Sequence, residues 1–431
     1  MQLILKYSII ISILLIAASC NSNKRISAPR NLERIYDPSS SSVHPKIKIY
    51  SLSDSSSVII EYLKTKELLF NQNNPENKLL SKVQVVYNLY DLNDKLNLVD
   101  SSTTTFKFDK DPKRQYEVVE VEVNSHKGSN YLLEIITTDV NRKNSQYSFY
   151  RINRTQENNL QDYYYFNKKD NEIIVDPYIR PGQEFGIKHY SRDIDSLYVH
   201  YFKNDFYISL PPYMEDTLID NVHTADTVWI CYLDSINYEN YRDEGLYYFS
   251  ENQTESNYNG GIVLFNFGEK FPVIRTPKKL AEPISYLGNT DSIPGPDSTG
   301  KLTKLAVDDF WLAKANNIDK SRELLIAYYN RVMLANKYFT SYKEGWKTDR
   351  GMIYVIYGLP DYLFKSGDEE RWIYNPEGIS TGITFIFNHV ENPFTFNHYV
   401  LDREKLKYTG WDTAVEMWNK GEIIYFQTRL E

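Results

Sequence analysis

The amino-acid sequence predicts a multidomain protein with a mostly β front half, made of two immunoglobulin-like β-sandwiches, followed by a C-terminal α+β domain. Short segments of alternating apolar residues, separated by turn residues, fill the chain up to about residue 275. A long segment with helical apolar spacing follows residue 318, and five of the six tryptophans lie after residue 310. Period-two alternation is typical of half-buried strands, whereas spacings of three and four are typical of helices.

Residues 46–155 predict the first sandwich. The strand-like runs lie at 46–52, 58–63, 81–91, 101–108, 115–124, 130–138 and 145–153. In the fifth run Val119, Val121 and Val123 share one parity and two glutamates share the other, which indicates a strand with one buried face. Short strands at this density are typical of immunoglobulin-like sandwiches.

Residues 160–275 predict a second β-rich domain. Its runs lie at 184–190, 196–202, 227–233, 245–250 and 261–268. Cys231 falls within the third run, where we expect it to act as a small buried hydrophobe. Residues 276–300 are rich in proline and glycine towards their end and predict a linker.

Residues 301–431 predict the α+β domain. We expect one helix over 301–316 and a second that begins after Asp319 and ends with Gly345 as its capping glycine. The apolar runs 352–357 and 383–387 predict strands that are covered on both faces. Trp411, Ala414 and Trp418 predict a last helix over 410–419.

A motif joins the predicted long helix to the strand predicted at 352–357. Its residues are Gly345, Trp346, Thr348, Asp349, Arg350 and Gly351, with Pro360 and Asp361 in the turn that follows. The pattern resembles the GWxTD domain, a family of unassigned biochemical function found mainly in Bacteroidetes-type bacteria. The resemblance implies a lipoprotein with a β-rich front half and this domain at its C-terminal end.

Taken residue by residue, the motif is interpreted as a helix-to-strand corner. Gly345 would adopt a backbone conformation that other residues resist, and Trp346 would anchor the following loop in the core. Thr348 and Asp349 would accept hydrogen bonds from backbone N–H groups of the turn. Gly351 would allow a close approach of the backbone.

A competing hypothesis makes the same region a ligand site. In the corner interpretation Arg350 pairs with Asp349 or Asp361. In the competing hypothesis these three side chains form a polar cluster in a cleft whose walls are Trp346 and Trp372. Such a cluster would suit a glycan or peptide, or hydrolysis by paired carboxylates. We favour the structural corner over the ligand site.

The N-terminus predicts a lipoprotein signal over residues 1–19. Its apolar stretch is too short for the roughly 20 residues that span a bilayer, and Ala17-Ala18-Ser19-Cys20 resembles a lipobox. We expect a lipid anchor on Cys20 and a flexible tether over 20–45. Basic residues follow Cys20 where surface-exported lipoproteins carry acidic ones, which favours the periplasmic face of the outer membrane over the cell surface.

Composition and motifs exclude several classes of function. The net charge is −8 without a basic stripe, so nucleic acid is not an expected partner. Catalytic motifs are absent from the sequence, the histidines lack metal-ligand spacing, and no cofactor, metal or catalytic residue is predicted. His389 and His398 could converge across a turn, but we expect two ordinary surface imidazoles.

Two functional hypotheses remain. The first is a non-catalytic outer-membrane lipoprotein that binds protein partners as a scaffold subunit of an envelope complex for assembly, secretion or transport. The alternative is an enzyme acting on peptidoglycan or another glycan, with its site in the C-terminal domain. A cleft joining Asp349, Asp361 and Trp372 would favour the enzyme, and a flat tyrosine-rich sandwich face would favour the binding protein.

Overall fold

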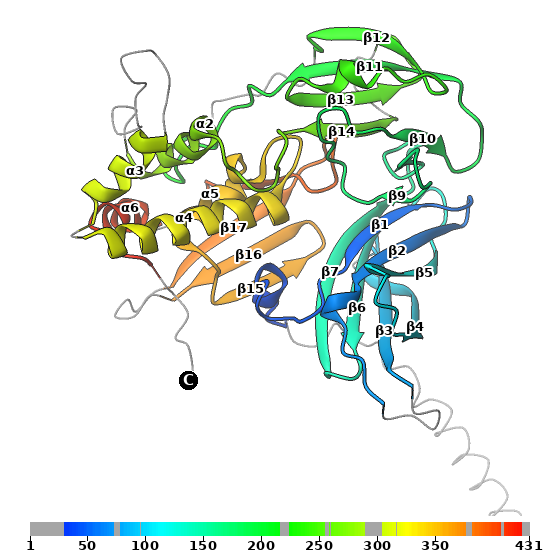
Figure 1. Cartoon of the computed structure of the whole chain (residues 1–431), viewed down its shortest axis with the longest axis horizontal. Helices are drawn as coiled ribbons and strands as arrows, with labels where there is room; N and C mark the ends of the chain where they lie inside the picture. The colour runs from blue at the N-terminus through cyan, green and yellow to red at the C-terminus, as the bar shows by residue number, and fades with distance from the viewer. Residues whose placement is uncertain are drawn as a thin grey trace, which may run out of the picture.

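The computed structural model describes residues 30–72, 78–94, 96–215, 224–254, 258, 260–288, 304–315, 317–375, 382–406 and 409–424. Two β-rich units pack against a unit of helices and strands (Figure 1). This arrangement confirms the predicted fold class, a mostly β front half followed by an α+β part. The predicted signal segment and Cys20 lie outside the described residues.

The first unit is a sandwich of two antiparallel sheets. Their strand orders are β1-β2-β5 and β4-β3-β6-β7. Each predicted run coincides with one strand: β1 Lys46–Ser51, β2 Ser56–Lys64, β3 Leu80–Asp91, β4 Asn97–Asp109, β5 Tyr116–Asn124, β6 Asn130–Asp139 and β7 Asn144–Asn153. In β5 the valines at 119, 121 and 123 are buried, whereas Glu120 and Glu122 are exposed, as their alternation predicts.

The second unit also consists of two sheets that enclose an apolar core. One has the order β10-β8-β9 and the other β12-β11-β13-β14. Their bounds are β8 Tyr163–Phe166, β9 Ile173–Ile174, β10 Gly186–His189, β11 Ser196–Lys203, β12 Thr227–Tyr232, β13 Gly245–Ser250 and β14 Ile262–Asn266. The short strands β8 and β9 were not predicted. Cys231 is buried as expected, and its sulfur accepts a hydrogen bond of 3.3 Å from Tyr241 at the end of the 3₁₀ turn η3, Tyr238–Tyr241.

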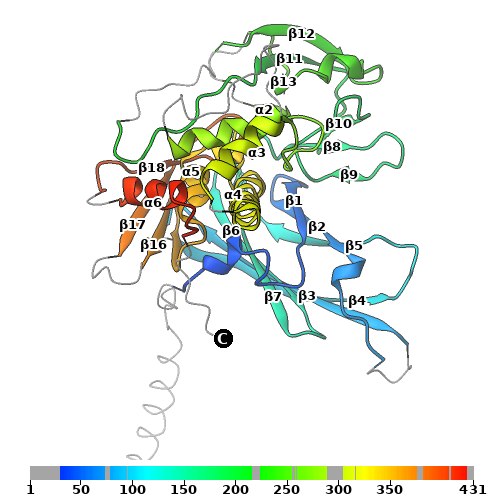
Figure 2. The same cartoon turned by 60° about the vertical axis from the view of Figure 1, so that its left-hand side comes forward.

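The C-terminal unit packs helices on a four-stranded sheet with the order β15-β16-β17-β18. Its elements are α2 Pro277–Ala281, η4 Glu282–Leu287, α3 Lys304–Ala313, α4 Ile318–Phe339, η6 Gly345–Lys347, α5 Asp349–Tyr357, β15 Tyr362–Ser366, β16 Glu369–Tyr374, β17 Ile383–His389, β18 Tyr399–Leu401 and α6 Trp411–Asn419. The long helix α4 crosses the unit and is seen nearly end-on in Figure 2. Asn317, rather than Asp319, caps α4, because its side chain accepts a hydrogen bond from the Lys320 N–H.

The apolar run 352–357 forms the helix α5 rather than the predicted strand. The Thr348 hydroxyl caps this helix by accepting a hydrogen bond from the Gly351 N–H, and all nine residues of α5 are buried. A helix surrounded by core has no polar face, so its sequence lacks the helical period and resembles a buried strand. The motif therefore joins two helices, and the predicted helix-to-strand corner is wrong in its second element.

Residues 30–45 are packed against the protein rather than forming a flexible tether. The 3₁₀ turn η1, Glu33–Tyr36, places Leu32, Ile35 and Tyr36 in the core of the C-terminal unit. The Leu32 N–H also donates a hydrogen bond of 2.8 Å to the Leu363 carbonyl. Local composition predicted a tether because the contacts that bury these residues come from distant parts of the chain, as when Ser41 bonds to Asn144 and Tyr36 to Glu370.

The predicted linker 276–300 is helical in the part that the structure describes. Its elements α2 and η4 contribute Ala281, Ile284 and Leu287 to the core of the C-terminal unit. Residues 289–303 lie outside the described part. The proline and glycine residues that predicted a linker are concentrated there.

A separate apolar cluster joins the second unit to the C-terminal unit. Phe202 and Tyr248, from β11 and β13, pack against Tyr342 and Phe394 of the C-terminal unit. The ring centroid of Phe394 lies 5.3 Å from that of Phe202 and 5.5 Å from that of Tyr248. The face of the β12-β11-β13-β14 sheet that carries Phe202 and Tyr248 is therefore covered in part by the C-terminal unit.

Candidate functional site

The motif Gly345–Gly351 forms a tight corner between α4 and α5. It begins with the single 3₁₀ turn η6, after which Thr348 caps α5. The Thr348 hydroxyl accepts a hydrogen bond of 3.1 Å from the Gly351 N–H and donates one of 2.7 Å to the Gly345 carbonyl. These bonds confirm the predicted role of Thr348 in satisfying backbone groups of the turn.

The two glycines of the corner are required by close packing. A Cβ atom on Gly345 would lie 2.0 Å from the Ala335 carbonyl oxygen, and one on Gly351 would lie 1.8 Å from the Gly345 carbonyl oxygen. Gly345 does not have a positive φ, so the predicted capping conformation is wrong. The glycine is needed because the chain passes directly against the backbone of α4.

Trp346 fills the core beneath the corner, as predicted, with 1 % of its surface exposed. Its backbone N–H donates to the Asn336 side-chain oxygen at 3.2 Å, and its carbonyl accepts the Tyr286 hydroxyl at 2.9 Å. The tryptophan is thereby fixed to α4 on one side and to η4 on the other.

Asp349 ties the corner to the far edge of the sheet. Its carboxylate accepts a hydrogen bond of 2.7 Å from the Leu401 N–H at the end of β18. Both guanidinium Nη atoms of Arg403 donate to it, at 3.0 and 3.2 Å. Asp349 is 5 % exposed, and these hydrogen bonds go to a distant strand and to Arg403 rather than, as predicted, to the backbone of its own turn.

Arg350 pairs with Glu370, and the predicted pairing with Asp349 or Asp361 is wrong. Its Nη1 lies 3.1 Å from the Glu370 carboxylate, and its Nη2 donates to the carbonyl and the side-chain oxygen of Asn397 at 2.9 and 2.6 Å. Its guanidinium carbon also lies 4.0 Å from the centroid of the Tyr399 ring. Arg350 is 2 % exposed, so its charge is enclosed by these partners.

Glu370 is the centre of this buried ionic network. It accepts hydrogen bonds from Lys365, from the Tyr36 hydroxyl at 2.9 Å and from the Trp372 indole at 3.3 Å. Burial alone would raise the pKa of Glu370, but the charges of Lys365 and Arg350 outweigh burial and lower it to about 2. The carboxylate therefore remains ionised at neutral pH.

The described residues do not form the predicted polar cleft. Asp361 precedes β15, at the opposite sheet edge from β18, and accepts a hydrogen bond of 2.6 Å from the Asn375 N–H. Trp346 and Trp372 are inside the core at 1 % and 0 % exposure, and Pro360 is buried beside Asp361. Asp349 and Asp361 therefore do not share a site, and neither tryptophan forms a cleft wall.

A second ionic group flanks the motif and was not predicted. Glu344, 1 % exposed, lies between the Nζ atoms of Lys347 at 2.5 Å and Lys279 at 3.0 Å. Burial raises the pKa of Glu344, but these two charges outweigh it and leave the pKa below its usual value. The charges next to the motif in the sequence were a signal for such pairing.

The corner also holds a loop of the second unit. The Ser209 N–H donates to the Lys347 carbonyl at 3.0 Å, and the Lys343 ammonium donates to the Tyr207 carbonyl at 2.9 Å. These bonds link residues far apart in the sequence across two units. The motif thus acts as a structural junction in this fold.

Within the described residues, no group of three or more His, Cys, Asp or Glu side chains is placed to hold a metal ion. In the same part of the chain, no helix is long and apolar enough to cross a membrane.

The fold and the buried corner define a β-rich protein with a C-terminal α+β unit organised around one motif. Residues 245–420 match the family model of the GWxTD domain, so this part of the chain is a GWxTD domain. The match begins within β13 and includes the whole motif corner.

No curated protein matches the chain. Among solved structures, a β-glucuronidase from Bacteroides uniformis is 9 % identical with a TM-score of 0.18, covering 28 % of this chain and 14 % of that one. The β-glucuronidase 2 of the same organism, covalently bound to cyclophellitol-6-carboxylate aziridine, is 10 % identical with a TM-score of 0.17, covering 27 % and 14 %. The chain thus spans about one seventh of their length.

Proposed function

We propose that the protein is a non-catalytic outer-membrane lipoprotein, anchored through Cys20, that binds a protein partner as a scaffold subunit of a cell-envelope complex. The complex would serve assembly, secretion or transport, and the partner would add an extended strand to β12. The observation that carries this proposal is the apolar surface on that strand.

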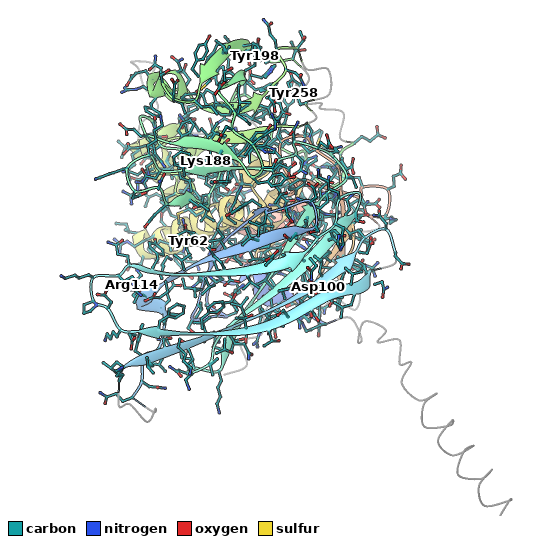
Figure 3. All side chains as sticks on the ribbon, turned by 90° about the vertical axis from the view of Figure 1, so that its right-hand side faces the viewer. Tyr62, Asp100, Arg114, Lys188, Tyr198 and Tyr258 are labelled. Atoms are coloured by element: carbon teal, nitrogen blue, oxygen red, sulfur yellow. The ribbon has the colours of Figure 1, made fainter. Side chains whose placement is uncertain are left out.

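Strand β12 lies at the edge of its sheet. Val228, Ile230 and Tyr232 point to one face because they alternate along the strand, and their exposed fractions are 41 %, 42 % and 55 %. Tyr198 lies directly opposite Ile230 on β11 and is labelled on this sheet in Figure 3. An edge strand presents backbone hydrogen-bonding groups to a partner, and alternate side chains provide specificity.

The edge strand β5 of the first unit provides a contrast. It also exposes an apolar residue, Val118, at 45 %, but the same face continues with Glu120 and Glu122. Charged residues on an edge strand oppose pairing with another chain. The apolar face of β12 has no such charge between Val228 and Tyr232.

The alternative of a glycan-acting enzyme built on the motif receives less support. Its proposed acid groups, Asp349 and Asp361, lie at opposite edges of the sheet. The ionised groups of the corner are also held by partners inside the core, where substrate does not reach them.

Affinity purification from native membranes after crosslinking tests the proposal. Ile230→Lys places a charge on the β12 edge, and we expect it to lose partner proteins that the wild-type chain retains. Val118→Lys is the matched control and should retain them. Equal recovery of partners by Ile230→Lys and wild type would reject β12 as the binding surface.

The lipid anchor needs a separate test. Cys20→Ser removes the thiol that the lipid would modify, so we expect the variant to move from the membrane fraction to the soluble fraction. Retention of Cys20→Ser in membranes after partners are removed would refute the anchor.

A further inference from the structure

A cavity of about 250 Å³ lies where the three units meet. The first unit contributes residues at the start of β6 and the end of β7, and the second unit contributes residues before β14. The C-terminal unit contributes the loop between β17 and β18. The side chains that matter for its chemistry are Asn130, Arg151, Gln156, Tyr258, His389 and Glu391.

The cavity wall carries polar side chains that are available to hydrogen-bond a ligand. Within the described part of the chain, the side chains of Asn130, Gln156 and Glu391 have no hydrogen-bond partner. Gln156 and Glu391 are exposed, which places them at the mouth. The amides can both donate and accept, whereas the carboxylate accepts only.

Arg151 supplies a fixed donor in the wall. Its Nη2 donates to the Gly367 carbonyl at 2.8 Å and to the Asp368 carboxylate, so the guanidinium is oriented. Its Nε is buried and lacks a hydrogen-bond partner among the described residues. An unmade hydrogen bond of a buried charged group is costly, which favours a ligand atom or water at this position.

His389 supplies an acceptor, and the prediction of an ordinary surface imidazole is wrong for it. The residue is half-buried, and its Nε2 lies 3.2 Å from the Phe396 carbonyl oxygen. Because a carbonyl oxygen only accepts, this hydrogen bond requires a proton on Nε2. Burial and then the charge of Arg151 lower the pKa of His389 to about 4, so the ring is neutral at pH 7. A neutral ring protonated at Nε2 leaves Nδ1 as an acceptor.

The walls are held in place by core contacts. Phe394 anchors the β17–β18 loop in the apolar cluster, and its ring centroid lies 5.4 Å from that of Tyr258 on the opposite wall. Asn392 stiffens the same loop, because its side-chain oxygen accepts the Phe394 N–H at 3.0 Å. A site with rigid walls loses little entropy when it binds.

We propose that this cavity binds one neutral hexose or N-acetylhexosamine residue. Sugar hydroxyls both donate and accept, which matches the mixed amide, carboxylate, guanidinium and imidazole groups of the wall. The C–H face of a sugar ring suits the apolar side chains Leu160, Tyr258, Pro393 and Phe396. Arg151 is already paired with the Asp368 carboxylate, and Glu391 adds a negative charge at the mouth, which disfavours an anionic ligand.

The size of the cavity sets the length of the ligand. Its volume is below the roughly 300–1,000 Å³ of sites for drug-sized ligands, so one ring would be enclosed. This inference is independent of the partner surface on β12, because the cavity is lined by none of the β12 residues.

The test uses the full-length protein titrated with glucose, galactose and N-acetylglucosamine, with glucuronic acid as a charged comparator. Saturation-transfer NMR and the shift in melting temperature report binding. We expect at least one neutral sugar to bind and to raise the melting temperature, because a ligand that contacts all three units stabilises the folded chain. Binding of none of the neutral sugars, or tighter binding of glucuronic acid, would overturn the proposal.

A pair of variants locates the site. Glu391→Trp fills the mouth and should weaken sugar binding at least about tenfold, a loss of about 1.4 kcal/mol. Glu404→Trp is the matched control, because Glu404 is exposed and does not line the cavity. Unchanged melting of both variants without sugar verifies that they fold. Unchanged sugar affinity in Glu391→Trp would place the bound sugar elsewhere and reject the cavity.

Discussion

At the scale of single residues, Glu61 is a carboxyl group inside the apolar core of the first unit. It is 0 % exposed, accepts one hydrogen bond of 2.9 Å from the Thr137 hydroxyl, and has a second oxygen without a partner among the described residues. Burial raises the pKa of Glu61 from 4.5 to about 7. Glu370 behaves oppositely, because two cations keep it ionised in the core.

The raised pKa of Glu61 predicts that the first unit becomes less stable as pH rises. The folded state binds the proton more tightly than the unfolded state, so the stabilisation is complete below pH 4.5 and is lost as pH rises through about 7. Above pH 8 the penalty is about 3 kcal/mol at 1.36 kcal/mol per pKa unit. Glu61→Gln should remove it, since the amide stays neutral.

Urea unfolding of wild type and Glu61→Gln at pH 5 and pH 8 measures the effect. We expect a gain for the variant at pH 8 and a small difference at pH 5. A difference that is the same at both pH values would show that Glu61 does not titrate between them.

At the scale of elements, the corner depends on two glycines, because Gly345 lets η6 pack against α4 and Gly351 lets α5 pack against η6. Gly345→Ala would drive a Cβ atom to 2.0 Å from the Ala335 carbonyl oxygen, so η6 must move away from α4. Overpacking of this kind costs roughly 1–3 kcal/mol or more. Gly128→Ala is the control, because Gly128 has a φ of +90° and nothing within 4 Å of the added atom.

We therefore expect Gly345→Ala to lower the urea midpoint more than Gly128→Ala does. The control reports the cost of a left-handed backbone alone, which is about 1 kcal/mol. Equal losses in the two variants would mean that η6 and α4 shift apart easily.

The elements also show what sequence patterns can reveal. The strands of the first unit were predictable because each has one buried and one solvated face, as in β5. The helix α5 was not, because burial on all sides removes its period. Its one local signal was Thr348 followed by Asp349, which are typical of a helix start.

The site was predictable only in part. Trp346 and Thr348 act locally, so their roles follow from residue type. Glu370, the partner of Arg350, lies 20 positions away in the sequence. Its only signal was its alternation with Trp372 and Tyr374 in β16, which places the three side chains on the buried face of that strand. The cavity was not predictable because three units that are distant in sequence contribute its walls.

At the scale of the whole molecule, the cluster around Phe394 couples the second unit to the C-terminal unit. Phe394 is 2 % exposed, and its replacement by Ala removes contacts to Phe202 and Tyr248 at a cost of roughly 3–5 kcal/mol. We expect wild type to unfold in one calorimetric transition and Phe394→Ala to unfold in two.

Phe185→Ala is the matched control for coupling. Phe185 is 0 % exposed but belongs to the core of the second unit alone. Its loss should lower the transition temperature without dividing the transition. A single transition in Phe394→Ala would show that other contacts hold the two units together.

The burial of Leu32, Ile35 and Tyr36 in the C-terminal core has a consequence in time. A chain that emerges N-terminus first, from a ribosome or from a translocation channel, delivers this segment before the strands β15 and β16 that it contacts, and Tyr36 is separated from Glu370 by 334 positions. The front units can fold before those strands have emerged, but the core of the GWxTD domain closes only after nearly the whole chain has emerged. The packing of Leu32, Ile35 and Tyr36 into that core is therefore a late step of folding, although these residues lie near the start of the described chain.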